Sequence, residues 1–212
     1  MRYLNDWNIF NESISKNHPI QELDIKEKLG IVLLGTPGSG KSTFIKNVIL
    51  PINRNIKSFS TDDVSLRLSG DPKIYNKRAS RLNLSYLDNY IKTGQNFIYD
   101  TTGANQAAVF DVCKQAYKNG YRIIFILLLI DLETTKKFNI ERGKMGGHEA
   151  DDDYIDFVYN TQNQTTKNYI KTLKPENFYI VLNRGIDKSY RYYKHTGKEI
   201  LKRKIDKYIP IK

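Results

Sequence analysis

A glycine-rich segment near the start of the chain carries the first residues that could do chemistry. Residues 35–43 read GTPGSGKST and match the pattern G-x-x-x-x-G-K-[ST] between a predicted strand and a predicted helix. Glycines let such a loop curl so that backbone N–H groups and the helix N-terminus point at phosphate oxygens. Lys41 would neutralise the β- and γ-phosphates, and Ser42 would hold Mg²⁺. The expected cofactors are ATP, or GTP, with Mg²⁺, and the expected nucleotide-binding residues are Gly35, Thr36, Pro37, Gly38, Ser39, Gly40, Lys41, Ser42 and Thr43.

Several classes of protein share this loop, and other parts of the sequence choose among them. The N-K-x-D pattern of GTPases is missing, since LNRGID at residues 182–187 is only superficially similar to it. The small size of the chain disfavours a motor with a second ATPase domain. A kinase needs a carboxylate within reach of the acceptor hydroxyl and a cation above the transferred phosphoryl group. The pattern therefore favours phosphoryl transfer.

Alternating strands and helices must position these residues. Apolar runs predict buried strands, and 3.6-residue periodicity predicts amphipathic helices between them. The strands are expected at residues 31–35, 56–60, 96–100, 121–131 and 177–183, and the helices at 41–50, 74–92, around Cys113, 132–141 and 151–173. Such alternation predicts an α/β fold: a doubly wound, mainly parallel five-stranded sheet with helices on both faces. The glycine-rich residues 142–150 would form a lid.

The chain is expected to divide into three parts. Residues 1–29 would be a helical N-terminal extension, residues 30–184 the phosphate-binding domain, and residues 185–212 a basic C-terminal hairpin and helix. From residue 186 onward, nine basic and three acidic side chains contribute +6 of the formal net charge of +11. Aromatic and basic residues alternate around Thr196 and Gly197, which could follow a phosphate backbone; a solvated edge hairpin is the alternative.

Composition indicates the compartment and the partners. A net charge of +11 favours polyanionic partners such as nucleic acid, although phosphate-rich small substrates or simple solubility would also account for it. Cys113 is the single cysteine, so no intramolecular disulfide can form and a reducing compartment is expected. No apolar run is long enough to cross a bilayer. These features predict a cytoplasmic protein. Abundant Lys, Asn, Ile and Tyr suggest an AT-rich coding genome, and if that genome is viral, the expected compartment is the host cytoplasm.

Four segments in order carry a resemblance to a known family. GTPGSGKST, STDD, IYDTTGAN and NIERGK together resemble the P-loop kinase domain of the bacteriophage-type 5′-hydroxyl polynucleotide kinases, over residues 30–182. The zeta-toxin kinases are similar through the first two segments. The first segment is specific by itself, and the order and spacing of the other three support it.

The resemblance implies roles for two charged residues. Asp62, which stands 21 residues after Lys41, would be the general base that orients and deprotonates the acceptor hydroxyl. Arg142 would be the lid arginine over the β- and γ-phosphates. Asp63 is expected instead to cap the following turn or helix, and capping without catalysis is the alternative for both aspartates.

The acceptor side is less well defined. Asp100 ends a predicted strand, and it and Thr101 fall in the segment that lines the acceptor side of the resembled kinases. The family's second basic residue is replaced by Ser65, so Arg67, with Arg78 on the next helix, is expected to contact the acceptor. A solvated helix face is the alternative for these cations.

Four functions therefore compete. The first is an ATP-dependent kinase of a nucleic-acid hydroxyl, most simply a polynucleotide 5′-hydroxyl. The second is a zeta-toxin-like kinase of a nucleotide sugar or another small metabolite, and the third a kinase of hydroxymethyl-uracil in DNA. A nucleotide-dependent nucleic-acid-binding protein without transfer activity is the fourth.

Overall fold

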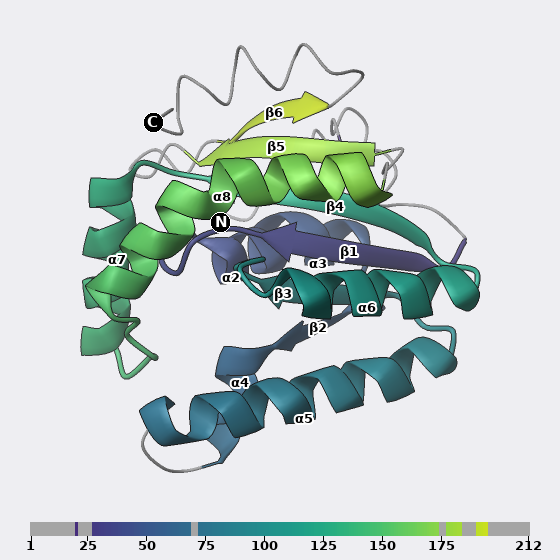
Figure 1. Ribbon diagram of the computed structural model, residues 1–212, viewed down its shortest axis with the longest axis horizontal. Coiled ribbons are helices and arrows are strands. Elements are labelled where there is room, and N and C mark those ends of the chain that lie inside the picture. Colours follow the sequence, from purple (N-terminus) through teal and green to yellow (C-terminus); the bar gives the residue numbers. More distant parts are fainter. Residues whose placement is uncertain (1–19, 21–26, 69–71, 174–176, 184–189, 195–212) are drawn as a thin grey trace, which may run out of the picture.

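A mainly parallel, six-stranded sheet forms the centre of the computed structural model, which describes residues 20, 27–68, 72–173, 177–183 and 190–194. The strand order is β2-β3-β1-β4-β5-β6 (Figure 1). The strands are β1 (Leu29–Leu34), β2 (Lys57–Ser60), β3 (Phe97–Thr101), β4 (Arg122–Leu129), β5 (Asn177–Asn183) and β6 (Tyr190–Lys194). The first five pair in parallel, and this confirms the predicted doubly wound α/β fold.

Helices cover both faces of the sheet. Those that the structure describes are α2 (Lys41–Phe44), η2 (Ile45–Ile49), α3 (Leu50–Ile52), α4 (Thr61–Arg67), α5 (Pro72–Lys92), α6 (Gln106–Lys118), α7 (Leu132–Lys144) and α8 (Asp152–Leu173). In Figure 1, α6 and α8 lie in front of the sheet, and α2 and α3 lie behind it. None of the helices in the described ranges is both long and apolar enough to span a membrane.

The central strands are apolar throughout because each face of the sheet packs into its own core. In β4, Ile124, Ile126 and Leu128 pack with α2 and η2, while the residues between them pack with α5, α6 and α8. A strand buried on both faces reads as a continuous apolar run. Cys113 lies on α6 in the second core, where burial raises the pKa of its thiol to about 12. Cys113 therefore serves in the packing of this core.

The helix that follows the glycine-rich loop is irregular, whereas the sequence predicts one helix over residues 41–50. Its middle turn, η2, is π-helical, and α3 carries it to Ile52. Pro51 has no N–H with which to donate to the preceding turn, so a regular α-helical ladder is interrupted there. The π turn keeps Ile45, Val48 and Ile49 buried.

The sixth strand corrects the prediction of five strands. Residues 190–194 pair antiparallel with β5, with Leu182 opposite Arg191 and Asn183 opposite Tyr190. Tyr190 packs edge-on against Phe44 with ring centroids 5.1 Å apart. The mixture of aromatic and basic side chains in this segment is thus that of an edge strand, with Tyr190 and Tyr192 on its packed face. The predicted turn at Thr196 and Gly197, the rest of the basic tail and most of the predicted N-terminal extension lie outside the described residues.

Candidate active site

The glycine-rich loop joins β1 to α2 and is held between two other elements. Gly38 has a φ of 81° and Gly40 a φ of 88°, which side chains with a Cβ rarely adopt. A Cβ on Gly38 would collide with the carbonyl oxygen of Thr135 in α7, and one on Gly40 would lie 2.7 Å from Nδ2 of Asn183 at the end of β5. The loop therefore requires glycine at both positions for conformation and for space.

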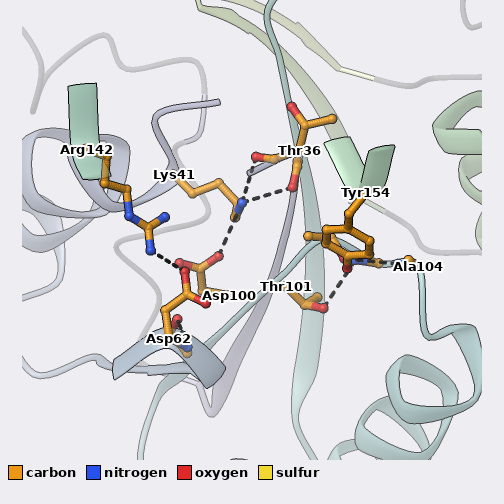
Figure 2. Close-up of polar contacts among 12 residues, drawn as sticks. Thr36, Lys41, Asp62, Asp100, Thr101, Ala104, Arg142 and Tyr154 are labelled. Carbon is orange, nitrogen blue, oxygen red and sulfur yellow. Dashed lines mark hydrogen bonds and ion pairs between the residues drawn. The ribbon is translucent and has the colours of Figure 1, made fainter. Parts of the chain in front are cut away.

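Lys41 turns its ammonium back onto this loop. Its Nζ donates to the carbonyl oxygens of Gly35 at 2.9 Å and Thr36 at 3.0 Å (Figure 2). Ser42 and Thr43, the next residues of α2, are exposed. The structure thus brings the predicted phosphate-binding groups together at the carboxyl end of β1. This strand lies between β3 and β4 in the sheet, where the strand order reverses.

Asp62 lies on the first turn of α4, directly after β2. The side-chain oxygen of Ser60 accepts a hydrogen bond from the Asp62 N–H at 3.2 Å, so Ser60 is the N-cap of the helix. The prediction that Asp63 caps this helix is therefore wrong: both aspartates lie in its first turn, where the helix dipole favours a carboxylate. Asp62 lines the pocket described below, and Asp63 does not.

Arg142 meets Asp62 although 80 residues separate them in the sequence. Nη2 of Arg142 donates to Oδ2 of Asp62 at 2.5 Å (Figure 2). Arg142 belongs to the last turn of α7, which extends to Lys144 instead of ending at residue 141 as predicted. The candidate base and the candidate lid arginine thus form an ion pair.

Asp100 is the buried carboxylate of the site. It stands near the end of β3, opposite Leu33 of β1, and Oδ1 lies 3.9 Å from Nζ of Lys41. Burial raises the pKa of Asp100 to about 6, against the opposing effect of the Lys41 charge. Burial also lowers the pKa of Lys41, with the Asp100 charge opposing that shift. Each group therefore keeps its charge mainly through the other.

The raised pKa of Asp100 predicts a pH-dependent stability. From the ordinary value of 3.8 up to about 6, the folded protein holds a proton that the unfolded chain has released, so the free energy of unfolding falls as pH rises through this window. The Asp100→Asn variant has no carboxyl group at this position and therefore lacks this pH dependence of the free energy of unfolding. Its stability relative to the unsubstituted protein should rise by an amount on the order of 1–3 kcal/mol between pH 4 and pH 7. Urea unfolding at several pH values measures this; a difference independent of pH would contradict it.

The segment after Arg142 forms a compact loop whose ends are tied together by Asn139. This buried side chain of α7 donates to the carbonyl oxygen of Ala150 at 2.9 Å and accepts from the Ala150 N–H at 3.0 Å. Gly147 packs onto Arg142, since a Cβ there would lie 2.7 Å from Cγ of the arginine. The glycines of the predicted lid thus also allow close packing around Arg142.

Loss of the Asn139 side chain should loosen this loop. Asn139→Ala removes two hydrogen bonds and is expected to cost about 1–3 kcal/mol of stability and to lower activity, because Arg142 and the far end of the loop lose their common anchor. Tyr121→Phe is the matched control: it removes the hydroxyl that donates to the carbonyls of Ile91 and Gln95, away from the site. Thermal unfolding and kcat measured for both variants test this. Equal loss of kcat in the two variants would assign Asn139 to stability alone.

These groups converge on one pocket of about 500 Å³. Of the predicted site residues, those that line it are Pro37, Lys41, Asp62, Asp100, Thr101 and Arg142. Arg67 and Arg78 are exposed on α4 and α5 and do not line it. The spacing of cations along a helix could not show that both side chains lie outside the pocket lining.

The pocket also contains residues that the sequence did not single out for the acceptor side. They include Ser80, Asn105, Glu149, Asp151 and Tyr154. His148 lines it as well. Asn105 also caps α6 by accepting from the Ala108 N–H at 3.2 Å. The sequence signal available for Glu149, Asp151 and Tyr154 was their position just after the lid glycines, at the start of a long helix.

Fold and site together define a P-loop protein with a kinase-like fold. A family model described as an AAA domain matches residues 31–167, more than half of the chain. The chain therefore belongs to this AAA domain family. None of the curated proteins compared with the sequence matches it.

Solved structures share the fold. A chain of the PezAT chromosomal toxin–antitoxin system of Streptococcus pneumoniae has a TM-score of 0.67 at 18% identity, over 94% of this chain and 84% of that one. A chain of AvrRxo1-ORF1:AvrRxo1-ORF2 with sulphate gives 0.65 at 11%, over 96% and 70%, and another structure of that complex contains ATP. A chain of the Pnkp1/Rnl/Hen1 RNA repair complex gives 0.56 at 22%, over 66% of this chain and 45% of that one. At these identities the likeness concerns the fold.

Proposed function

We propose that this protein is an ATP-dependent kinase that transfers the γ-phosphate to a hydroxyl group. The contact of Asp62 with Arg142, in the pocket that also holds Lys41 and Asp100, carries the proposal. A carboxylate for the acceptor proton and cations for the transferred phosphoryl group are the parts that phosphoryl transfer needs. The ATP complex of a protein with a similar fold supports ATP as the donor.

In the proposed reaction the acceptor oxygen attacks the γ-phosphorus in line. The bond from this phosphorus to the β–γ bridging oxygen breaks, ADP leaves, and the acceptor proton passes to a carboxylate oxygen of Asp62. Lys41 and Arg142 stabilise the charge on the phosphoryl oxygens. The glycine-rich loop fixes the β- and γ-phosphates, and the loop around Arg142 excludes water that would compete with the acceptor.

Mg²⁺ fits the residues present. In the described part of the chain no three His, Cys, Asp or Glu side chains converge to hold a metal ion. Mg²⁺ usually takes few protein ligands and is completed by substrate phosphates and water. The exposed Ser42 hydroxyl would hold it, with Asp100 positioned toward the same phosphates through Lys41. Bound there, the ion would neutralise charge that develops on the phosphate oxygens.

The lining of the pocket favours a small acceptor. Four carboxylates, those of Asp62, Asp100, Glu149 and Asp151, surround it, and its lysine and arginine are the two residues assigned to ATP. A kinase of a small metabolite, as in the zeta-toxin resemblance, fits this arrangement.

A polynucleotide 5′-hydroxyl is the second candidate. Ser80 of α5 lines the pocket, and its neighbours Lys77, Arg78 and Arg81 on the same helix are exposed cations that could hold a strand outside it. The hydroxyl of hydroxymethyl-uracil in DNA would use the same cations.

Transfer of labelled γ-phosphate from ATP in the presence of Mg²⁺ tests the proposal. The acceptors are 5′-hydroxyl DNA and RNA oligonucleotides, hydroxymethyl-uracil DNA, nucleosides, free sugars and nucleotide sugars. Label on any of them establishes the kinase, and its position identifies the acceptor. ATP binding without transfer to any acceptor would refute the kinase and leave a nucleotide-dependent binding protein.

A further inference from the structure

Tyr154 lines the side of the pocket opposite Asp62 and Arg142, two of the residues assigned to phosphoryl transfer. Arg142 and Asp62 lie on one side of Lys41 in Figure 2, and Tyr154 lies on the other. Its ring comes from the first turns of α8, and the side chain is 41% exposed although it lines the pocket. A large aromatic side chain that remains open inside an active-site pocket offers a flat apolar surface to whatever binds there.

The ring is held in place from both ends. At one end, the backbone of Tyr154 is part of α8, and the residue that follows it in this helix, Ile155, is fully buried. Its hydroxyl shares a hydrogen bond of 3.1 Å with Oγ1 of Thr102, which in turn accepts from the Ala104 N–H at 3.4 Å. The side chain therefore bridges α8 and the segment after β3, and its face is fixed before any acceptor arrives. Preorganised groups give specificity at low entropic cost.

The charges beside the ring disfavour an acceptor that carries phosphate. Lys41 and Arg142 already face Asp100 and Asp62, and ATP would occupy both cations. Beyond these two, the described residues that line the pocket supply Glu149, Asp151 and His148 but no further lysine or arginine. Carboxylates accept hydrogen bonds from hydroxyl groups and repel phosphate.

We infer that Tyr154 determines acceptor specificity and selects an uncharged, ring-containing compound with free hydroxyls, such as a sugar or a nucleoside. The ring of the acceptor packs on Tyr154, and the carboxylates accept hydrogen bonds from its other hydroxyls while one hydroxyl reaches Asp62. This inference rests on the proposed kinase activity.

Matched acceptors test the inference in the full-length chain. Nucleosides are compared with their 3′-monophosphates, and free hexoses with their 1-phosphates, by transfer of labelled phosphate from ATP. The uncharged member of a pair should have the higher kcat/KM by about tenfold or more, and Glu149→Lys should narrow that difference. Comparison of the nucleosides with the hexoses shows whether the preferred uncharged acceptor is a nucleoside or a free sugar.

Variants test the residue. Tyr154→Ala should raise the KM for the acceptor about tenfold and leave the KM for ATP unchanged, because stacking on an aromatic ring is worth about that factor. Tyr154→Phe keeps the ring and should lie between the two. Tyr117→Ala on α6 is the matched control, since Tyr117 is 43% exposed and does not line the pocket.

The outcomes separate the two proposals. Preference for the phosphorylated members or for oligonucleotides would overturn the inference and leave the kinase standing. If Tyr154→Ala behaves like Tyr117→Ala, Tyr154 has no part in specificity. Transfer to no acceptor at all, with ATP bound, refutes the kinase itself and the inference with it.

Discussion

The Asp62→Asn variant should lose nearly all phosphoryl transfer, with kcat reduced by about 10²–10⁴-fold. Asparagine keeps the size of the side chain but cannot take up the acceptor proton. ATP binding should persist, because Asp62 contacts Arg142 and the substitution leaves the glycine-rich loop and the contacts of Lys41 with it in place. Initial rates of transfer and an independent measurement of ATP affinity, for example by isothermal titration, separate the two effects.

The neighbouring aspartate supplies the control for this variant. Asp63→Asn makes the same chemical change one residue along the same turn of α4, at a side chain that does not line the pocket. Its kcat should stay within a factor of about 3, since surface changes of this kind usually alter free energies by no more than about 0.5 kcal/mol. Full activity of Asp62→Asn would show that another carboxylate is the base, and Asp100 and Glu149 would be the next to replace.

The Arg142→Ala variant should lower kcat by about 10³-fold or more, the size of effect found when an arginine that contacts the transferred phosphoryl group is lost. Arg142→Lys should recover little, because a lysine ammonium lacks the planar fork that binds two oxygens at once. Steady-state kinetics with ATP and the best acceptor measure both variants. The control is Arg78→Ala, which removes an exposed arginine of α5 outside the pocket.

The control distinguishes the two acceptor classes as well. With a small acceptor, Arg78→Ala should leave kcat and both KM values unchanged. With an oligonucleotide, it should raise the KM for the strand and weaken its salt dependence. An Arg142→Ala variant with normal kcat would remove Arg142 from the mechanism and leave its contact with Asp62 as a structural ion pair.

The sequence predicts the central fold well because its signals there are local. The run of apolar residues in β4 and the loop between β1 and α2 each specify their structure over a few residues. The predicted C-terminal hairpin implies a strand at β6, but its addition to the central sheet was missed because a five-residue segment that mixes Tyr and basic side chains has the same pattern in a sheet edge and in a solvated hairpin. Only the pairing of this segment with β5 makes it an edge strand of the sheet.

The site is predictable only in part for a similar reason. Lys41, Asp62, Asp100 and Arg142 each belong to a short motif; Lys41, Asp62 and Asp100 lie at or just after the ends of β1, β2 and β3, whereas the last turn of α7 brings Arg142 to them. Tyr154 has no motif, and its place opposite these groups depends on how α8 crosses the sheet. Long-range geometry, rather than residue type, determines such positions.

The contact between Asp62 and Arg142 has a consequence for the order in which ATP and the acceptor bind. While the guanidinium holds the carboxylate, the acceptor cannot make its hydrogen bond to Asp62, so acceptor binding waits for ATP. ATP offers Arg142 a more highly charged partner and so releases Asp62. Addition should therefore be ordered, with ATP first, and an unreactive acceptor analogue should inhibit uncompetitively against ATP. A molecule built this way stays latent when ATP is scarce, even if its acceptor is abundant.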